Sequence, residues 1–518
     1  MPRSESHFDR FQTFRETGAI PLFGSKKVLC DGLSRRDLLH IGGLSAMGLS
    51  LDLYTRARSL QASPAGAPEG VFGRAKACIL LFLFGSPSQL ETFDPKPDAP
   101  VEVRGELGVI PSIVPGVQIC DRLPRTAQIV DRLTIVRSMT HEYPVHGVAY
   151  ALTGMPTYTP AIEAKPLDAS HWPFIGSIVD HVDARHASGA LPEIPRNIGL
   201  PWLFGSQATD YPPLAGPYAA FLGSAHNPVW TSFAGKATRL VPHLSDRQTV
   251  DVRDHFAGVE PDGSFQLAAT GTAPDLPQRR LETRRTLLQQ FDDVRIGLES
   301  HPSVSTYARQ QQAAYSLLTS RKIRDALDIQ QEPAHVREEY GMTLFGQASL
   351  AARRLVEAGS RFVSVFWDPV GPFGISVWDT HENHFPRMKE YLLPVFDQTY
   401  PALIRDLDQR GMLDETLVVC ISEHGRTPRI SNNSKGGGRD HWSRAYSAVM
   451  AGGGVGRGNV VGRTDRIAGD VENTPVSPKD ILATTFHLLG ISTETLMYDR
   501  LNRPLPLAGS GAVRSELF

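Results

Sequence analysis

Mainly apolar runs mark the strands that this chain is expected to form. The clearest of these runs are residues 77–84, 133–138, 362–367, 417–421 and 446–450. Runs rich in Val, Ile and Phe, without regular alternation of polar residues, are typical of strands that are covered on both faces. Apolar residues with helical spacing occur at residues 347–359 and 385–410, which predicts amphipathic helices there.

The order of these elements predicts the topology. The helix expected at 385–410 stops before Gly411 and joins the strand at 362–367 to the strand at 417–421. A strand, a helix and a second strand in succession favour a parallel pair of strands. The sequence therefore predicts an α/β fold with a mostly parallel central sheet and helices on both faces.

The domain organisation is expected to be simple. Residues 161–277 are rich in Pro, Gly and Ser and show no sustained period, so we expect an irregular insertion that shapes a cleft. Residues 279–327 have a helical character and are expected on the outside of the sheet. The chain has no internal repeat, and residues 68–518 are expected to form one domain.

The first 67 residues have the features of an export signal. Ser-Arg-Arg-Asp-Leu-Leu at residues 34–39 precedes a modestly apolar stretch at 41–53, as in a twin-arginine signal. The stretch is shorter than the roughly 20 residues that span a bilayer, so cleavage between Ala62 and Ala67 is favoured over a permanent anchor. The alternative is an amphipathic helix of a cytosolic protein. We expect export to the periplasm or beyond the cell.

Composition and cysteine content narrow the possible partners. The chain has 55 acidic and 53 basic residues and a net charge of −2, so nothing in its composition favours nucleic acid or an anionic membrane. Of four cysteines, Cys30 lies in the expected signal, and Cys78, Cys120 and Cys420 remain. Three thiols without a CxxC pattern predict neither a disulfide framework nor cysteine-bound zinc.

Pairs of acidic residues and histidines follow the expected strands. In chain order they are Asp379 with His381, Glu423 with His424, and Asp440 with His441. The last pair follows a Gly-rich loop at 436–438. Ligands bind at the carboxyl ends of the strands in open α/β sheets, and carboxylate with imidazole suits zinc, manganese or iron. The alternative is that each pair makes ordinary loop hydrogen bonds.

Two further loops carry polar candidates. Strand 77–84 opens into a loop with Ser88, Glu91 and Asp94, of which Asp94 is alternatively a turn residue before a proline. After strand 133–138, His141 and His146 precede a short helix, whose amino terminus would suit a phosphate or sulfate group. Either histidine could instead cap the helix or fill space.

Four motifs together resemble the secreted "domain of unknown function 1501" family, which is related to sulfatases and alkaline phosphatases. They are Pro-Ser-Gln-Leu-Glu-Thr-Phe-Asp-Pro-Lys at 87–96, Trp-Asp-Thr-His at 378–381, Ser-Glu-His-Gly-Arg-Thr-Pro-Arg at 422–429 and Gly-Arg-Asp-His-Trp at 438–442. The resemblance runs from about residue 77 to the carboxyl terminus. It implies an alkaline-phosphatase-like fold.

The resemblance also implies a metal site. In the wider superfamily, two metals are held by residues that would correspond here to Asp379, His381, Glu423, His424 and His441. The chain has Glu423 where the superfamily has Asp, and many closer relatives have Phe at the position of His424, so one metal is the alternative to two. The ion would be a divalent metal such as zinc, manganese or calcium.

The implied activity is hydrolysis of a sulfate or phosphate ester, carried by a small molecule or by a sulfated or phosphorylated glycan. No Cys-x-Pro-x-Arg motif is present, so formylglycine chemistry is not expected. Thr140 or Ser88 could act as nucleophile, or a metal-bound water could attack directly. His141 is a further catalytic candidate beside Thr140.

Arg426 and Arg439 are the candidates for binding the anionic group, with salt bridges inside the loop as their alternative role. A second class of function is a secreted or cell-surface binding protein that keeps the fold without catalysis, and the lack of an obvious nucleophile favours it.

Overall fold

The computed structural model describes residues 70–143, 147–155, 165–186, 192–209, 214–244, 249–267, 320–371, 377–432 and 436–518. These residues belong to one compact unit, Ser63–Phe518. The expected export signal, His146 and most of the helical region at 279–327 lie outside the described residues.

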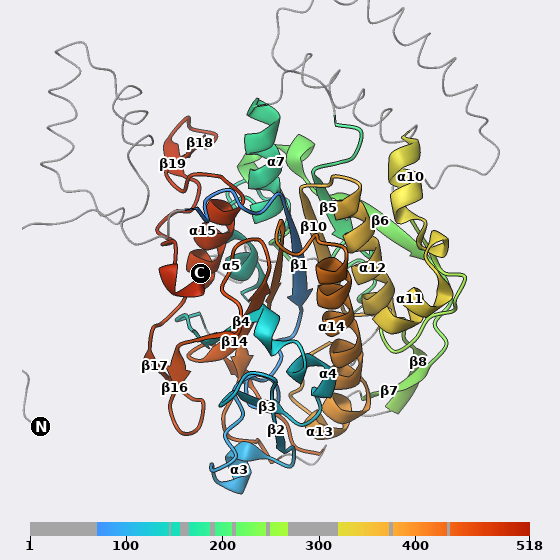
Figure 1. The fold of residues 1–518 in the computed structure, drawn as a ribbon, viewed down its shortest axis with the longest axis vertical. Coiled ribbons are helices and arrows are strands. Elements are labelled where there is room, and N and C mark those ends of the chain that lie inside the picture. Colours follow the sequence, from blue (N-terminus) through green and yellow to red (C-terminus); the bar gives the residue numbers. More distant parts are fainter. Residues whose placement is uncertain are drawn as a thin grey trace, which may run out of the picture. The chain divides into compact units, whose positions relative to one another are not determined.

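A mixed sheet forms the centre of the described part of the chain (Figure 1). Its nine strands follow the order β15-β4-β14-β11-β1-β10-β5-β6-β9. In chain order they are β1 Ala77–Leu83, β4 Leu133–Met139, β5 Asn197–Leu200, β6 Val229–Ala234, β9 Ser264–Leu267, β10 Phe362–Trp367, β11 Thr416–Ile421, β14 Tyr446–Ala451 and β15 Asn459–Val461.

The three most apolar strands lie side by side in the middle of this sheet. β1 pairs in parallel with β10 on one side and with β11 on the other, which places Cys78 opposite both Phe362 and Leu417. All residues of these three strands are buried. The β10–β5, β5–β6 and β15–β4 pairs are also parallel, whereas β14 and β9 pair in antiparallel fashion. The predicted mostly parallel sheet is confirmed.

Helices cover both faces of the sheet. Phe362 of β10 contacts Phe174, directly before α7 (Ile175–His186), with ring centroids 5.8 Å apart. Trp367 of the same strand contacts Phe345 of α12 (Leu344–Glu357), with ring centroids 4.6 Å apart. Because Phe362 and Trp367 are an odd number of residues apart, their side chains point to opposite faces. The prediction of helices on both faces is confirmed.

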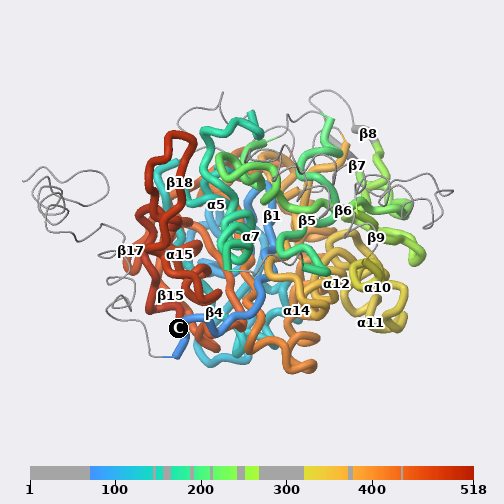
Figure 2. The backbone as a smooth tube through the Cα atoms, turned by 90° about the horizontal axis from the view of Figure 1, so that it is seen from above, coloured from blue at the N-terminus to red at the C-terminus, as the bar shows by residue number. Residues whose placement is uncertain are grey.

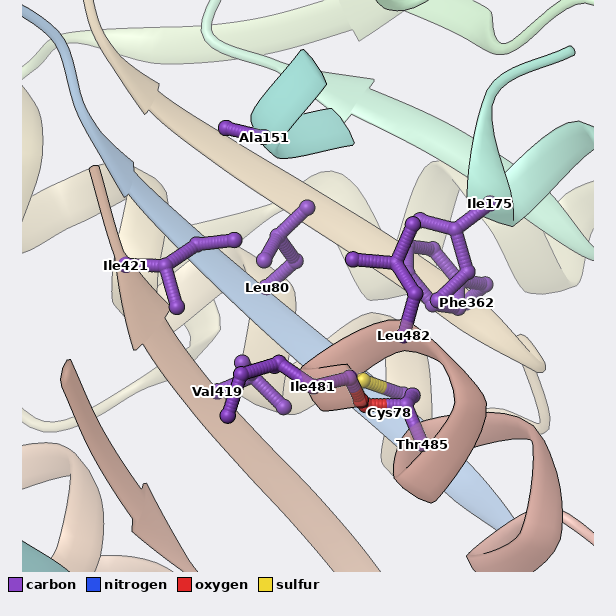
Figure 3. A pocket seen from close by; sticks show the side chains of 10 residues that line it. All are labelled: Cys78, Leu80, Ala151, Ile175, Phe362, Val419, Ile421, Ile481, Leu482 and Thr485. Atoms are coloured by element: carbon purple, nitrogen blue, oxygen red, sulfur yellow. The ribbon is translucent and has the colours of Figure 1, made fainter. Parts of the chain in front are cut away.

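Figures 1 and 2 show which helices share a face. α12 and α14 (Leu393–Gln409) lie on one side of β1, and α5 (Val148–Thr153) and α15 (Pro478–Leu488) lie on the other. Figure 3 shows the apolar packing on the second side, where Leu482 of α15 and Ala151 of α5 face Leu80 of β1. The space left there is about 10 Å³, which leaves room for no ligand.

The remaining elements are short. The helices are α3 Val101–Arg104, α4 Pro124–Ala127, α10 Arg321–Leu327, α11 Ala334–Tyr340 and α13 His384–Arg387. The small strand pairs are β2 Val109–Pro111 with β3 Gln118–Cys120, β7 Leu240–Leu244 with β8 Thr249–Arg253, β12 Gly425–Arg426 with β13 His441–Trp442, β16 Arg463–Thr464 with β17 Val471–Asn473, and β18 Leu496–Tyr498 with β19 Pro504–Pro506. Between α13 and α14, residues Met388–Leu392 form a π-helical turn, so the predicted helix at 385–410 is divided.

The expectation of an irregular insertion at 161–277 is wrong for its described residues. They include α7 and three strands of the central sheet, β5, β6 and β9. These strands are only four to six residues long, and they are stabilised by pairing with distant parts of the chain. A local hydrophobic period is too weak a signal for them.

The three cysteines of the described residues lie in the interior. Cys78, Cys120 and Cys420 are buried free thiols, and burial raises the pKa of each. No helix of the described residues is long and apolar enough to cross a membrane.

Candidate metal centre

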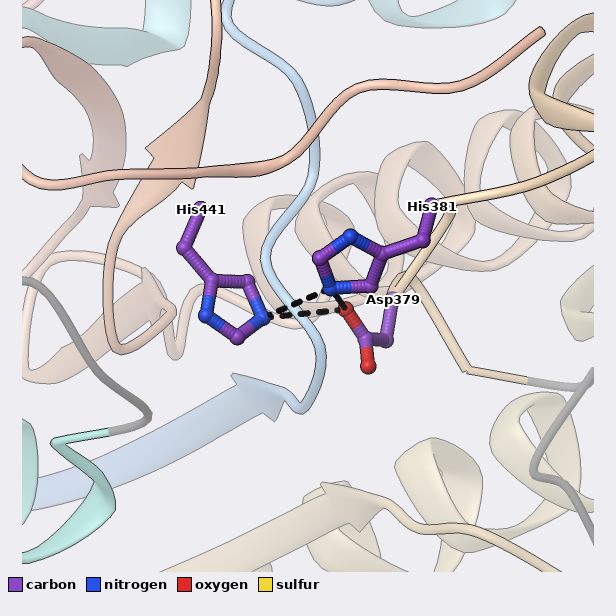
Figure 4. Close-up of side chains that lie close together, drawn as sticks. All are labelled: Asp379, His381 and His441. Atoms are coloured by element: carbon purple, nitrogen blue, oxygen red, sulfur yellow. Dashed lines mark hydrogen bonds and ion pairs between the residues drawn. The ribbon is translucent and has the colours of Figure 1, made fainter. Parts of the chain in front are cut away.

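Three of the predicted ligands meet at the carboxyl ends of the central strands (Figure 4). Nε2 of His381 lies 2.9 Å from Nε2 of His441 and 3.1 Å from Oδ1 of Asp379. The distance from His441 Nε2 to the same Asp379 oxygen is 3.3 Å. Asp379 and His381 lie in the segment between β10 and α13, and His441 begins β13. Among the described residues, these three form the group that could share one metal ion.

Two glycines allow the contributing loops to approach this closely. A Cβ atom at Gly438 would lie 1.6 Å from the carbonyl oxygen of His381. A Cβ atom at Gly85, whose φ is +95°, would lie 2.3 Å from the backbone nitrogen of Asp379. A side chain at either position would therefore push the loops apart. Within the Gly-rich loop at 436–438, Gly438 is therefore required by the lack of space for a side chain.

Asp440 determines which nitrogen of His381 faces the other ligands. Its Oδ1 lies 2.7 Å from Nδ1 of His381, so the carboxylate accepts the Nδ1 proton and leaves the Nε2 lone pair directed at Asp379 and His441. When Nε2 is protonated instead of bound to a metal ion, it donates to Asp379, and this hydrogen bond, aided by the one to Asp440, raises the pKa of His381. The sequence analysis paired Asp440 with His441 and did not predict its contact with His381.

Arg426 positions Asp379 instead of facing a substrate. Its side chain is fully buried and forms an ion pair with Asp379 Oδ1. The rest of the guanidinium donates to backbone carbonyls, including those of Ser86 and Arg439 at 3.1 Å each. The predicted role of Arg426 in binding an anionic group is wrong, because its N–H groups already donate to these acceptors inside the protein.

Arg439 is occupied in the same way. It is fully buried, and its Nη2 lies 2.6 Å from Oε1 of Glu91. Oε2 of Glu91 lies 3.1 Å from Nε2 of His384. Although burial alone would raise the pKa of Glu91, Arg439 and then His384 lower it to about 2. The predicted anion-binding role of Arg439 is therefore wrong too, and its salt bridge joins it to the loop after β1 instead of staying inside its own loop, as the alternative had it.

Glu423 and His424 are close to the three ligands but serve other contacts. Glu423 Oε1 accepts a hydrogen bond of 2.8 Å from the backbone nitrogen of Gly85. His424 places its ring against that of His441, with centroids 4.5 Å apart, and its Nδ1 lies 2.8 Å from the carbonyl oxygen of Gly425. The structure does not bring their donor atoms into the group formed by Asp379, His381 and His441.

An open cavity of about 700 Å³ borders the centre, and His441, Thr140 and His141 all line it. Thr140 is half-buried. Nδ1 of His141 accepts a hydrogen bond of 3.1 Å from the backbone nitrogen of Tyr143, so Nε2 carries the proton and donates it to the carbonyl oxygen of Glu423 at 2.8 Å. Burial lowers the pKa of His141. His141 is thus held as a neutral donor, which does not suit the predicted catalytic role.

Ser88, the other predicted nucleophile, is almost completely buried and is not among the residues that line the cavity. Asp94 pairs with Lys96 at 2.9 Å. Of the polar candidates in the loop after β1, Glu91 contacts another predicted site residue, because it forms the ion pair with Arg439.

The donor set fits a divalent metal ion. One carboxylate and two imidazoles are ligands that zinc and manganese accept. Zinc with tetrahedral ligands at roughly 2.0–2.2 Å holds them roughly 3.3–3.6 Å apart. The three donor atoms here lie 2.9–3.3 Å apart, so a small outward shift would admit the ion. The carboxylate on His381 is the usual partner of a metal-binding imidazole.

The family of the chain follows from a comparison of its sequence with family models. The model described as "Protein of unknown function (DUF1501)" matches residues 75–518. Because the match covers most of the sequence, the chain belongs to this family. A comparison with curated proteins gave no match.

Solved structures with a distant likeness include hydrolases and a synthase. A sulfatase from Pseudoalteromonas sp. has 13% identity and a TM-score of 0.35, with 89% of this chain and 74% of that chain covered. The phosphonate monoester hydrolase of Agrobacterium radiobacter has 12% identity and a TM-score of 0.33, with coverages of 85% and 77%. A lipoteichoic acid synthase from Listeria monocytogenes has 9% identity and a TM-score of 0.33, with coverages of 85% and 78%.

Proposed function

We propose that this protein is a metal-dependent hydrolase of sulfate or phosphate esters with one metal ion in its active site. The observation that carries the proposal is the convergence of Asp379, His381 and His441 at the edge of an open cavity. A divalent ion held there would polarise an ester oxygen and lower the pKa of a neighbouring hydroxyl group.

Each nearby residue has a defined task in this proposal. Asp379, His381 and His441 bind the ion, Asp440 fixes the tautomer of His381, and Arg426 holds Asp379 in place. The hydroxyl of Thr140, in the wall of the same cavity, is the candidate nucleophile. Arg426 and Arg439 are buried, and Arg444 in the cavity wall is paired with Asp470. The metal ion would therefore be the main cationic group that meets an anionic ester.

The proposed location is outside the cytoplasm. Residues 1–67 have the pattern of a twin-arginine signal, and residues 68–518 would form the mature protein. This route carries folded proteins, which suits a metalloprotein.

A non-catalytic binding protein that retains the fold is the second candidate. It is favoured by His141, whose Nε2 proton is donated to a backbone carbonyl, so that this histidine cannot serve as a general base beside Thr140. The same metal centre would then hold an anionic ligand without cleaving it.

Turnover of simple esters separates the two candidates. The purified protein, supplied with zinc, manganese or calcium, would be assayed with 4-nitrophenyl sulfate, phosphate and phenylphosphonate. We expect hydrolysis of at least one ester, lost in His441→Ala and retained in His335→Ala, which alters an exposed histidine on α11. Bound metal without turnover of any ester would favour the binding protein.

A further inference from the structure

The cavity beside the metal centre has a distinctive wall formed by Glu142, Trp442, Arg444 and Asp470. We call these four residues the Trp442 wall. Its side chains carry two carboxylates and one guanidinium, so its formal charge is −1 at neutral pH. The opposite sign would be expected if the wall were built to bind a second anionic group.

Trp442 is held in a fixed orientation. Its Nε1 donates a hydrogen bond of 2.7 Å to the carbonyl oxygen of Gly469, and the ring remains partly exposed. A fixed aromatic ring offers an apolar surface to a ligand at a small cost in side-chain entropy.

The charge of Arg444 is balanced by Asp470. Its Nη2 lies 2.5 Å from Oδ1 of Asp470, and its guanidinium carbon lies 5.6 Å from the centroid of the Trp442 ring. Both members of the ion pair are about half exposed or more, at 61% and 48%, so they can still bond to a ligand. Together they present N–H donors and carboxylate acceptors side by side, which are the partners that neutral hydroxyl groups need.

We propose that the Trp442 wall binds the alcohol part of the ester, and that this part is a neutral sugar ring. The inference rests on the proposed function, because it takes the ester group to lie at the metal centre. The C–H face of the sugar would pack on Trp442, and its hydroxyl groups would bond to Arg444 and Asp470. A second anionic group on the same sugar would meet Asp470 and Glu142 and would be disfavoured by like charge.

Matched substrates test this specificity. The 6-ester of glucose, as sulfate or phosphate according to the class that is turned over, is compared with the same ester carrying a second anionic group at position 1 and with the 4-nitrophenyl ester. We expect kcat/KM to be at least about 10-fold higher for the glucose monoester than for the doubly charged sugar. Equal or better turnover of the doubly charged sugar would overturn the proposal.

Variants of the wall identify its contribution. Trp442→Leu is expected to raise KM for the glucose monoester by about 10-fold, with a smaller effect on the nitrophenyl ester and on kcat. The double variant Glu142→Gln, Asp470→Asn is expected to narrow the preference for the singly charged sugar. Proportional losses on all substrates would contradict a role in recognising the sugar.

Arg457→Gln is the matched control for Arg444→Gln. Arg457 forms an exposed ion pair with Asp414 at 2.9 Å, and Asp414 lies before β11, at the end of the strand away from the metal centre. Only Arg444→Gln should change discrimination between the sugars. If both variants changed this discrimination equally, the effect would come from general surface charge, which would contradict a specific role of Arg444.

Calorimetric binding separates failure of the wall from failure of the proposed function. If no ester is hydrolysed, glucose 6-phosphate and glucose 1,6-bisphosphate are titrated into the metal-loaded protein and into Trp442→Leu. If the monophosphate binds more tightly than the bisphosphate, and Trp442→Leu weakens this binding, the proposal for the Trp442 wall is supported. The hydrolase proposal would then be wrong. Equal binding of both sugars, unchanged in Trp442→Leu, would overturn the wall.

Discussion

Asp440 and His381 form a 2.7 Å contact between a largely exposed carboxylate and Nδ1 of the imidazole. Through this contact, a residue that does not itself reach the three donor atoms determines which His381 nitrogen faces them. Carboxylates in this position tune metal binding in many proteins. The contact therefore leads to a first prediction about affinity.

Asp440→Asn should weaken zinc binding by about 10–100-fold. The amide can donate to Nδ1 and so favour the tautomer whose Nε2 carries a proton and cannot bind metal. The affinity would be measured by competition with a chromophoric chelator. Asp414→Asn, which changes an exposed carboxylate of a surface ion pair, is the control, and equal affinities of the two variants would contradict the role given to Asp440.

Gly438→Ala should weaken metal binding by about 10-fold or more while the protein stays folded. The new Cβ would clash with the carbonyl oxygen of His381, so the loop that carries His441 must move away. Gly116→Ala is a suitable comparison for the general cost of replacing a glycine, because its φ of +81° strains an alanine there although the Cβ meets no atom within 4 Å. Metal binding and circular dichroism of both variants check the prediction, which fails if Gly438→Ala binds metal like the wild type.

Glu91→Gln should lower stability and change its acid dependence. The folded pKa of Glu91 is about 2, below the ordinary value of 4.5. Its contribution is therefore present above about pH 4.5 and is lost as the pH falls towards 2. The variant also leaves Arg439 buried without its charged partner, at a cost of about 3–5 kcal/mol.

Urea unfolding from pH 7 down to pH 2 would measure this effect. The wild type should lose stability more steeply than Glu91→Gln over the lower half of that range. Parallel curves for the two proteins would show that Glu91 does not titrate as described.

Asp368 should make the stability of the fold depend on pH in the opposite direction from Glu91. Burial raises the pKa of this carboxyl to about 7, although Trp202 Nε1 and the Gly205 nitrogen each donate a hydrogen bond of 2.9 Å. The stability that comes from its protonated form is full below about pH 4 and is lost as the pH rises through 7. Asp368→Asn should flatten the curve between pH 4 and pH 8 in thermal unfolding. A variant curve with the wild-type slope would contradict this.

The sequence predicted the strands that have the longest apolar runs, whereas β5, which is fully buried but only four residues long, was missed. β1, β10 and β11 lie in the middle of the sheet between two layers of helices, so every residue in them is apolar or small and the runs are unmistakable. β6 lies near the edge, has exposed residues such as Ser232, and pairs with β9 about 35 residues later along the chain. Its stability comes from a partner that no local pattern reveals.

The place of the candidate site was also predictable from the order of the strands. Residues at the carboxyl ends of neighbouring parallel strands must meet, which brought His381 and His441 into one hypothesis. The direction of each side chain could not be predicted, and Glu423 turns to Gly85 instead. Arg426 and Arg439 have acceptors 340 and 348 residues earlier in the chain, at Ser86 and Glu91, so their burial was invisible to local reasoning.

Metal content tests the account most directly. The protein, purified without chelators, would be analysed for metals beside His441→Ala and His424→Ala. We predict one equivalent of a divalent metal in the wild type, loss of that metal in His441→Ala, and its retention in His424→Ala, because His424 contacts the ring of His441 without joining the donor group. No bound metal after incubation with zinc, manganese and calcium, or equal loss in both variants, would contradict a centre formed by Asp379, His381 and His441.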